Sequence, residues 1–354
     1  MTLLALINIE NRINDIMNRI ILTTVFSLII ILLQSFEQEA LAQKRGLAWQ
    51  GPSKSISTPY LQGQYHALII GNTTYQDKDG VWKPLDTPGN DADAMAEVLA
   101  TDYGFGHVTV LKDAERRDIL LALSDLSKKV EPNDSVLVYY AGHGHLNERT
   151  KRGYWIPVDA KGEDNTTFIR NSTIRDELNI IAERTKHTLL ISDSCFSGSL
   201  LRSGNRAATK SEKTNPYYIK VSNKKSVQIL TAGGVEFVDD NYKDSGHSPF
   251  TYFLISELKN NVDNLLTMSE LATNVIKAVA NNVEQMPASG VLQGAGDELG
   301  EFIFARVSLK DNTVEIVSGK FDEKKQEVEL MKATTKAPKK PEPDTDAFTP
   351  LPRF

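Results

Sequence analysis

The sequence predicts an α/β fold in which a mostly parallel sheet carries helices on both faces. From residue 65 onward, short apolar segments alternate with amphipathic segments of helical periodicity, an order typical of parallel sheets. Two apolar segments, 135–141 and 189–192, end abruptly in small and polar residues, as buried strands do where they reach the rim of a sheet. Ligands bind beyond the carboxyl ends of such strands, so these two ends mark the expected site.

The predicted elements follow one another in a regular order. We expect strands over 65–70, 107–111, 135–141, 154–158, 189–192, 227–231 and 302–304, the fourth of them as a hairpin addition. One helix is expected to be capped by Asn90 and Asp91. Further helices are expected over 119–130, 174–184, 249–259 and 269–283. Residues 202–225 are polar and basic without apolar periodicity, which predicts a long exposed connection.

Composition changes at both ends of the chain delimit one domain. We expect a signal peptide over 1–42, a linker over 43–63, the folded domain over 64–306 and a disordered tail over 307–354. The 354 residues are 40% hydrophobic and 24% charged, which is ordinary for a folded domain. The formal net charge of −6 argues against general nucleic-acid binding, because such binding relies on a basic surface.

The N-terminal pattern predicts export. Arg19 precedes an apolar run over 20–33, and Ala40 and Ala42 place small residues where a signal peptidase cleaves. Counting from Met17 gives a signal peptide of normal proportions, so Met17 is an alternative start. An uncleaved membrane anchor is the other possibility, although the run is short for a membrane span. In both cases we expect a bacterial-type signal and a periplasmic or secreted protein, with membrane contact only if the segment stays uncleaved.

Cys195 is the single cysteine of the chain and follows the apolar segment 189–192. An exported protein with one cysteine has no internal disulfide, so its thiol calls for another explanation. Most lone cysteines are inert and buried, but a polar strand end offers little to a packing residue. His143 follows the segment 135–141 in the same way. Two neighbouring parallel strands would therefore bring a thiol and an imidazole together.

This pair has the chemistry of nucleophilic catalysis. The thiolate is the nucleophile, and a neighbouring imidazole can take the thiol proton and later donate it to a leaving amine. The main-chain N–H groups of Gly144 and Cys195 are candidate donors of an oxyanion hole. The residues predict an acyl-transfer mechanism with Cys195 as nucleophile and His143 as general acid and base.

Two motifs, residues 139–144 and 193–198, resemble the histidine and cysteine motifs of the caspase-like peptidases, particularly the bacterial metacaspases or orthocaspases. Similar segments at 67–72, 154–160 and 246–248 extend the resemblance over about residues 64–306. The resemblance implies a caspase-like three-layer sandwich, a His/Cys dyad and hydrolysis of peptide bonds through a thioester acyl-enzyme. It also implies a large part over 64–201 and a small part over 226–306, on either side of the connection.

The resemblance also implies a specificity. Metacaspase-type enzymes cleave after Arg or Lys, and the acidic residues of their first pocket correspond to Asp91 and Asp193. A carboxylate pair selects a cationic side chain by charge-assisted hydrogen bonds. The alternative is that Asp91 merely caps its helix. Protein or peptide substrates with Arg or Lys at the cleaved bond are the expected partners.

Self-cleavage and cofactor use can also be addressed from the sequence. Arg202, Arg206 and Lys210 lie in the connection soon after Cys195, so they are the candidate self-cleavage sites. No cofactor is expected. Calcium-dependent relatives often carry an acidic residue after the cysteine motif, whereas this chain has no acidic residue at 200–202. Calcium activation is therefore not favoured, although Asp and Glu elsewhere could supply oxygen ligands. By analogy with the family, we expect a monomer.

Other interpretations of the same residues are weaker. A catalytically silent module for protein interaction would keep the motifs without turnover. A metal hydrolase could use His143 and His145, but a zinc site needs three or four ligands, so His145 is expected in an exposed loop. Segment 204–211 nearly matches a phosphate-binding loop, but Thr209 replaces the glycine that would let main-chain amides surround the phosphate. We therefore treat this match as coincidence. His247 is expected to shape the cleft without being catalytic. Three other histidines are expected to be structural: His66, His107 and His187.

Overall fold

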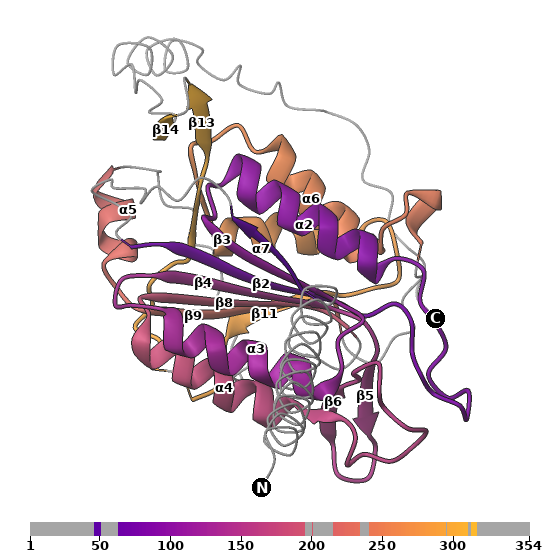
Figure 1. The fold of residues 1–354 in the computed structure, drawn as a ribbon. Helices are drawn as coiled ribbons and strands as arrows, with labels where there is room; N and C mark the ends of the chain where they lie inside the picture. The colour runs from indigo at the N-terminus through magenta and orange to yellow at the C-terminus, as the bar shows by residue number, and fades with distance from the viewer. Residues whose placement is uncertain are drawn as a thin grey trace, which may run out of the picture. The chain divides into compact units, whose positions relative to one another are not determined.

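The central element of the structure is a twisted sheet between two layers of helices (Figure 1). The structure, a computed structural model, describes residues 46–50, 63–194, 200, 215–233, 241–294, 296–310 and 313–316. Over these residues the sheet has seven strands in the order β1-β3-β2-β4-β8-β9-β11. The inner strands are parallel and the two outer strands are antiparallel to them. This confirms the predicted α/β fold with a mostly parallel sheet.

The inner strands agree closely with the sequence prediction. They are β3 (His107–Lys112), β2 (Tyr65–Gly71), β4 (Ser135–Ala141), β8 (His187–Asp193) and β9 (Ser226–Thr231). Strands β2, β4, β8 and β9 are buried along their whole length, as strands covered on both faces must be. The outer strands were not predicted: they are β1 (Gly46–Gln50), within the expected linker, and β11 (Ala288–Val291).

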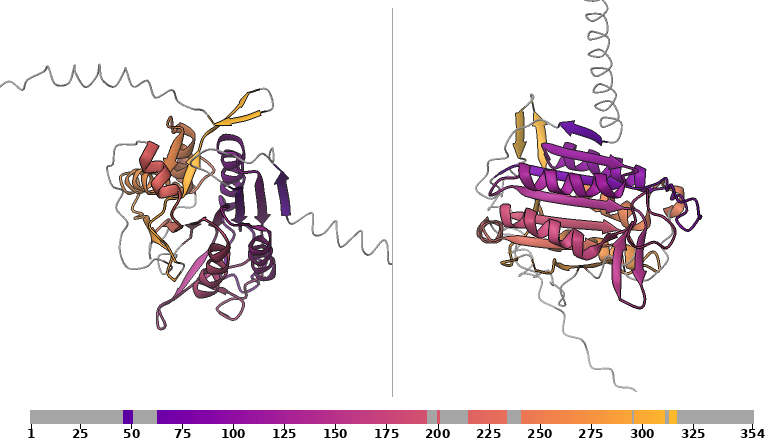
Figure 2. Two further views of the ribbon diagram at one scale, coloured as in Figure 1. Left: turned by 90° about the vertical axis from the view of Figure 1, so that its left-hand side faces the viewer. Right: turned by 60° about the horizontal axis from the view of Figure 1, so that its bottom comes forward.

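Helices cover both faces of the sheet (Figure 2). One face carries α2 (Pro88–Asp102), α6 (Pro249–Asn260) and α7 (Met268–Ala280), and the other carries α3 (Arg116–Lys129) and α4 (Asn171–Arg184). Successive strand residues point to opposite faces. Tyr139 accordingly lies in the core cluster with α2, α6 and α7, whereas Tyr140 lies in the cluster with α3 and α4. The result is the three-layer sandwich that the sequence predicts.

Smaller sheets lie beside this core in the described part of the chain. They are β5 (Gly144–Asn147) with β6 (Arg152–Trp155) and β7 (Ile169–Arg170), β10 (Leu265–Thr267) with β12 (Ile303–Ala305), and β13 (Val307–Lys310) with β14 (Thr313–Ile316). The strand expected over 154–158 is β6, which starts and ends earlier because it pairs with both β5 and β7. The strand expected over 302–304 is β12, which pairs with β10 outside the main sheet.

Two expected boundaries also differ from the structure. The connection over 202–225 was expected to be exposed throughout, but it contains α5 (Asn215–Ser222), whose Tyr218 is buried. The β13–β14 hairpin continues the ordered chain beyond residue 306, where a disordered tail was expected. Tyr218 of α5 and Val307 of β13 both lie in the core cluster with residues of α2, α6 and α7, and local composition does not reveal such contacts.

The segment expected to be a signal peptide, 1–42, lies outside the described residues, as does most of the expected tail. Among the helices that the structure describes, none combines the length and the apolarity needed to cross a membrane.

Candidate active site

The ends of β4 and β8 lie side by side, as the sequence predicts. The two strands are parallel neighbours, and Ala141 at the end of β4 is in register with Asp193 at the end of β8. His143 lies two residues beyond the first of these ends, and Cys195 two residues beyond the second. Cys195 itself lies outside the described residues, and so do the expected self-cleavage sites Arg202, Arg206 and Lys210.

Gly142 turns the chain at the end of β4, and this turn sets the direction of His143. Its φ of +153° lies in the region that favours glycine. A Cβ here would come within 2.9 Å of the Tyr75 hydroxyl and 3.0 Å of the Tyr140 hydroxyl. The amide of Gly142 donates to the main-chain oxygen of Asp193 at 3.3 Å. The turn that carries His143 is therefore tied to the end of β8.

The His143 ring is held by a loop between β2 and α2. Its main-chain amide donates to the Tyr75 hydroxyl at 2.8 Å, and its Nε2 lies 2.8 Å from the main-chain oxygen of Lys83. The rings of Tyr75 and Trp82 lie beside the imidazole, with centroids at 4.7 and 5.6 Å. A carbonyl oxygen only accepts hydrogen bonds, so Nε2 carries the proton of the neutral ring and Nδ1 carries the lone pair. Nδ1 is therefore the basic nitrogen of this histidine.

Gly144 begins a rigid hairpin. It is the first residue of β5 and pairs with Trp155 of β6. The main-chain oxygen of His143 accepts hydrogen bonds from the Ile156 amide at 3.0 Å and from the Tyr140 hydroxyl at 2.8 Å. The Tyr140 ring stacks on Trp155 at 4.1 Å between centroids. These contacts fix the peptide that joins His143 to Gly144.

The prediction that His145 lies in an exposed loop is wrong. This residue is part of β5 and half-buried, with its ring beside Trp82, Tyr154 and Phe168. Burial lowers the pKa of its imidazole. The residues that the structure describes contain no group of three or more His, Cys, Asp or Glu side chains that could hold a metal ion. The aromatic cluster explains His145 as a packing residue.

The structure brings Asp91 and Asp193 together around the beginning of α6. Ser248 is the N-cap of this helix, and its hydroxyl accepts from the Thr251 amide at 2.9 Å. The same hydroxyl donates to Oδ2 of Asp193, and the main-chain amide of Ser248 donates to Oδ2 of Asp91 at 3.4 Å. The N-terminus of a helix stabilises nearby negative charge. One residue therefore bridges the two carboxylates that the sequence singles out.

Asp193 is also held from the core side. The Thr251 hydroxyl donates to its Oδ2 at 2.6 Å, and Tyr139 lies 2.6 Å from the same hydroxyl. A hydroxyl has one proton to donate, so Tyr139 donates to Thr251 and Thr251 donates to Asp193. Burial and the charges of Asp91 and Asp193 raise the pKa of the Tyr139 hydroxyl. This chain of donors stabilises the ionised form of Asp193.

Asp91 is not a helix cap. Helix α2 begins at Pro88 with Thr87 as its N-cap, so the expected cap at Asn90 and Asp91 is wrong by three to four residues. The side chain of Asp91 is 1% exposed, and its Oδ1 accepts a hydrogen bond from Nδ1 of His247 at 2.7 Å. Burial raises the pKa of the Asp91 carboxyl, and the contact with His247 opposes this rise.

Several residues of the site were missed or placed only loosely from the sequence. Ser248 followed by Pro249 is a recognisable helix start, and this signal could have found the residue that joins the two carboxylates. Tyr75 and the main-chain oxygen of Lys83 carry no local signal, because their role depends on a loop folding back over β4. Thr251 has the pattern of an ordinary helix residue, so the sequence does not mark it as part of the site.

The other histidines are structural, as expected. His66 pairs with Asp134 at 3.0 Å and stacks on the ring of His107, at the amino ends of β2 and β3. His187 at the start of β8 bonds to the Ser226 hydroxyl at 2.8 Å and to the main-chain oxygen of Ser222 at 3.0 Å. All three lie at the ends of the strands opposite to the candidate site.

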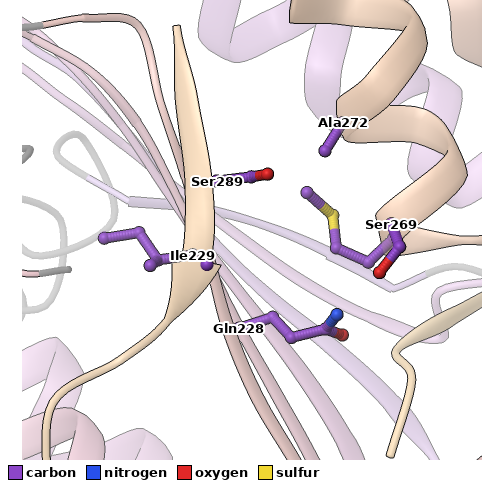
Figure 3. Close-up of a pocket in the computed structure, with 7 residues that line it drawn as sticks. Gln228, Ile229, Ser269, Ala272 and Ser289 are labelled. Carbon is purple, nitrogen blue, oxygen red and sulfur yellow. The ribbon is translucent and has the colours of Figure 1, made fainter. Parts of the chain in front are cut away.

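A small hollow lies between β9, β11 and α7 (Figure 3). Its most polar lining group is the amide of Gln228, which donates to Glu301 at 3.0 Å and accepts from the Phe302 amide at 2.8 Å. Because this amide is already paired and the lining residues contain no acid or base, the hollow is not a second catalytic site.

Comparison with known proteins gives a consistent result. A family model described as "Caspase domain" matches residues 64–291. Metacaspase-7 of Arabidopsis thaliana is 29% identical over an alignment of 170 residues, and the match covers 42% of this chain and 39% of that protein. Metacaspase-4 of the same plant is 29% identical over an alignment of 132 residues, and the match covers 32% of this chain and 29% of that protein. The matched region thus spans less than half of the length of these relatives. A crystal structure of caspase-1 from Spodoptera frugiperda is 16% identical, with a TM-score of 0.46 over 70% of this chain and 96% of that chain.

Proposed function

Because the chain belongs to the caspase-domain family, we propose that it is a cysteine-type endopeptidase that hydrolyses peptide bonds in protein substrates. The observation that carries the proposal is the register of β4 and β8, whose adjacent ends precede His143 and Cys195 by two residues each. We expect a nucleophile and a base two residues beyond paired strand ends to lie within reach of one substrate.

In the proposed mechanism, Nδ1 of His143 takes the proton of the Cys195 thiol, and the thiolate attacks the substrate carbonyl carbon. The Nε2–H bond to the Lys83 oxygen supports the imidazolium, because a carbonyl dipole stabilises the positive ring. The tetrahedral oxyanion is held by the amides of Gly144 and Cys195. Its collapse breaks the peptide C–N bond, and His143 returns the proton to the leaving amine. Water, activated by the same imidazole, then hydrolyses the thioester and releases the acid.

We also propose that the enzyme cleaves after Arg or Lys. The support is the pair of buried carboxylates, Asp91 and Asp193, which Ser248 joins. Asp193 is two residues before Cys195, so it belongs to the nucleophile's own strand end, whereas Asp91 comes from α2. A cationic side chain in such a pocket gains charge-assisted hydrogen bonds, whereas an acidic side chain meets like charge.

Hydrolysis of three fluorogenic peptides tests the activity and the specificity together. The peptides end in Arg, in Asp or in citrulline, which has nearly the shape of Arg without its charge. The full chain is compared with Cys195→Ala and His143→Ala, and His107→Gln serves as the control at a remote histidine. We expect cleavage of the Arg peptide by the parent protein and by the control, and none by the two dyad variants. Retained cleavage by Cys195→Ala would exclude the mechanism.

The same assay addresses cofactors and the alternative function. The proposed mechanism needs no metal, so activity should be equal in calcium and in a chelator; strong activation by calcium would show a dependence that the sequence did not favour. A folded protein that cleaves none of the peptides, and no protein substrate, would instead support a catalytically silent interaction module.

We propose that the enzyme also processes itself in the connection between β8 and α5, after Arg202, Arg206 or Lys210. Intact-mass measurement of the purified chain tests this. The parent protein should give fragments that end at one of these residues, and Cys195→Ala should stay intact. If both proteins stay at full length under conditions of peptide cleavage, self-processing is excluded.

Export and the monomeric state are further parts of the proposal. The N-terminal pattern supports export, and the mature N-terminus of protein recovered from the producing cell would show whether cleavage follows Ala42. Light scattering of the purified protein tests the monomer.

A further inference from the structure

We propose that His247, held on Asp91, is the group that receives the basic side chain of the substrate, and that Asp91 acts through this imidazole. The inference rests on the proposed function and deepens it, because it names a specificity-determining residue that contacts the substrate. The basis is a pair of side chains from segments far apart in sequence, at the pocket where the cation is expected.

The first observation concerns access to Asp91. Its side chain is 1% exposed, whereas the side chain of His247 is 25% exposed. Oδ1 of Asp91 accepts from Nδ1 of His247, and Oδ2 accepts from the amide of Ser248. The side chain of Thr87 bonds to the carboxylate as well. A cation that approaches from solvent therefore meets the imidazole of His247 before it meets the carboxylate.

The second observation concerns the two ring nitrogens of His247. Nδ1 lies 2.7 Å from a carboxylate oxygen, which accepts only, so Nδ1 carries a proton. In the neutral ring, Nε2 then carries the lone pair. No hydrogen bond joins Nε2 to the residues that the structure describes. A guanidinium or an ammonium group only donates, so this nitrogen is complementary to Arg and Lys.

The carboxylate behind the ring strengthens the acceptor. A carboxylate that accepts from one ring nitrogen fixes the tautomer and raises the electron density at the other nitrogen, as it does behind metal-binding histidines. Asp91 therefore attracts the substrate's cation indirectly, by making Nε2 of His247 a stronger hydrogen-bond acceptor. Asp193, on the other side of Ser248, supplies the second negative charge.

The third observation is that the His247 main chain is fixed. Its oxygen accepts from the Tyr242 amide at 2.8 Å, and its amide donates to the Ser245 hydroxyl at 3.3 Å. Gly246, with φ +76°, provides the turn, and its oxygen accepts from the Asn90 side chain at 3.4 Å. The ring is therefore positioned by its own turn and by α2 before any substrate arrives.

The test compares kcat/KM for the Arg and citrulline peptides. The parent protein should prefer the Arg peptide. In His247→Gln the Arg-to-citrulline ratio should be lower by about tenfold, the value of one charge-assisted hydrogen bond. Gln keeps a polar group near Asp91, so this variant preserves the fold better than His247→Ala does. His107→Gln, at the opposite end of the sheet, should behave as the parent.

Each failure has its own signature. Cleavage of neither peptide by the parent overturns the proposed function and this inference with it. Cleavage with equal rates for Arg and citrulline overturns the basic specificity and the role of His247. A parent preference for Arg that His247→Gln leaves unchanged overturns the role of His247 alone. A stronger preference for Arg in His247→Ala would also overturn it, because it would mean that the ring only covers Asp91.

Discussion

The Nε2 atom of His143 lies 2.8 Å from the main-chain oxygen of Lys83, a residue 60 positions earlier in the chain. Pro84 follows Lys83, and a residue before proline is restricted to extended conformations. The oxygen that orients the imidazole is therefore presented by a stiff piece of backbone. The loop between β2 and α2 therefore orients the imidazole that we propose as the base, and this contact fixes its tautomer.

Tyr75→Phe should slow catalysis without weakening substrate binding. The hydroxyl of Tyr75 accepts from the amide of His143 at 2.8 Å, and its loss removes one hydrogen bond of about 1 kcal/mol. We expect kcat to fall by about fivefold with an unchanged KM, measured with the Arg peptide. The exposed Tyr252 provides a matched control, Tyr252→Phe. An unchanged kcat in Tyr75→Phe would mean that the strand end alone positions His143.

Ser248→Ala should destabilise the protein and weaken its preference for Arg. The substitution removes the N-cap of α6 and the hydroxyl that donates to Asp193. The loss of a cap alone costs about 1 kcal/mol, measurable as a lower urea midpoint. Ser248→Thr keeps a hydroxyl and should restore both properties. Equal stability of Ser248→Ala and the parent would contradict the role given to this cap.

The buried His187 should make stability depend on pH. Burial lowers the pKa of its imidazole to about 4, below the value of about 6.5 in an unfolded chain. Between these values the unfolded state binds the extra proton, so the contribution of His187 is fully present above pH 6.5 and is lost as the pH falls toward 4. The total loss is about 3 kcal/mol.

Denaturant unfolding at a series of pH values checks this prediction. In His187→Gln, which cannot titrate, the free energy of unfolding should fall less between pH 6.5 and pH 4 than in the parent. Parallel curves for the two proteins would show that His187 stays neutral in both states or is charged in both.

Gln285→Met should stabilise the protein. Both polar atoms of the Gln285 side chain are buried without a hydrogen-bond partner among the residues that the structure describes, and an unpaired buried amide group costs about 1 to 3 kcal/mol. Met has a similar volume and no amide to leave unpaired. We expect a higher free energy of unfolding by about 1 kcal/mol or more. A lower melting temperature would show that the amide is paired in solution.

The sequence prediction was most accurate where strands are long and buried. The bounds of β4 match the prediction, and β2, β8 and β9 differ from it by one or two residues, because continuous apolar runs that end in polar residues are visible without tertiary information. Strands β5, β10 and β11 have three or four residues each and could not be predicted. Their formation depends on partners elsewhere in the chain, and such short segments carry no periodicity.

The residues of the candidate site show the same difference between what local sequence reveals and what depends on distant contacts. His143 could be located because it lies just beyond the end of a predictable strand. Asp193 lies at the end of such a strand, but its role was inferred from family resemblance. Asp91 was found through family resemblance. The alternative that it caps its helix is wrong, and Pro88 at the first helical position already marks the start of α2 in the sequence. The contact between Asp91 and His247 joins residues 156 positions apart, and no local pattern predicts such a contact.

The parallel pairing of β8 with β9 has a consequence for a protein cut in the connection between them. The two strands are in register over six residue pairs, and Asp91 and Asp193 on one side of the cut are bonded to His247 and Ser248 on the other. A nicked molecule would therefore remain a single particle of two chains, separable only by denaturation. The acidic pocket is shared between the two chains, so neither fragment would contain it alone.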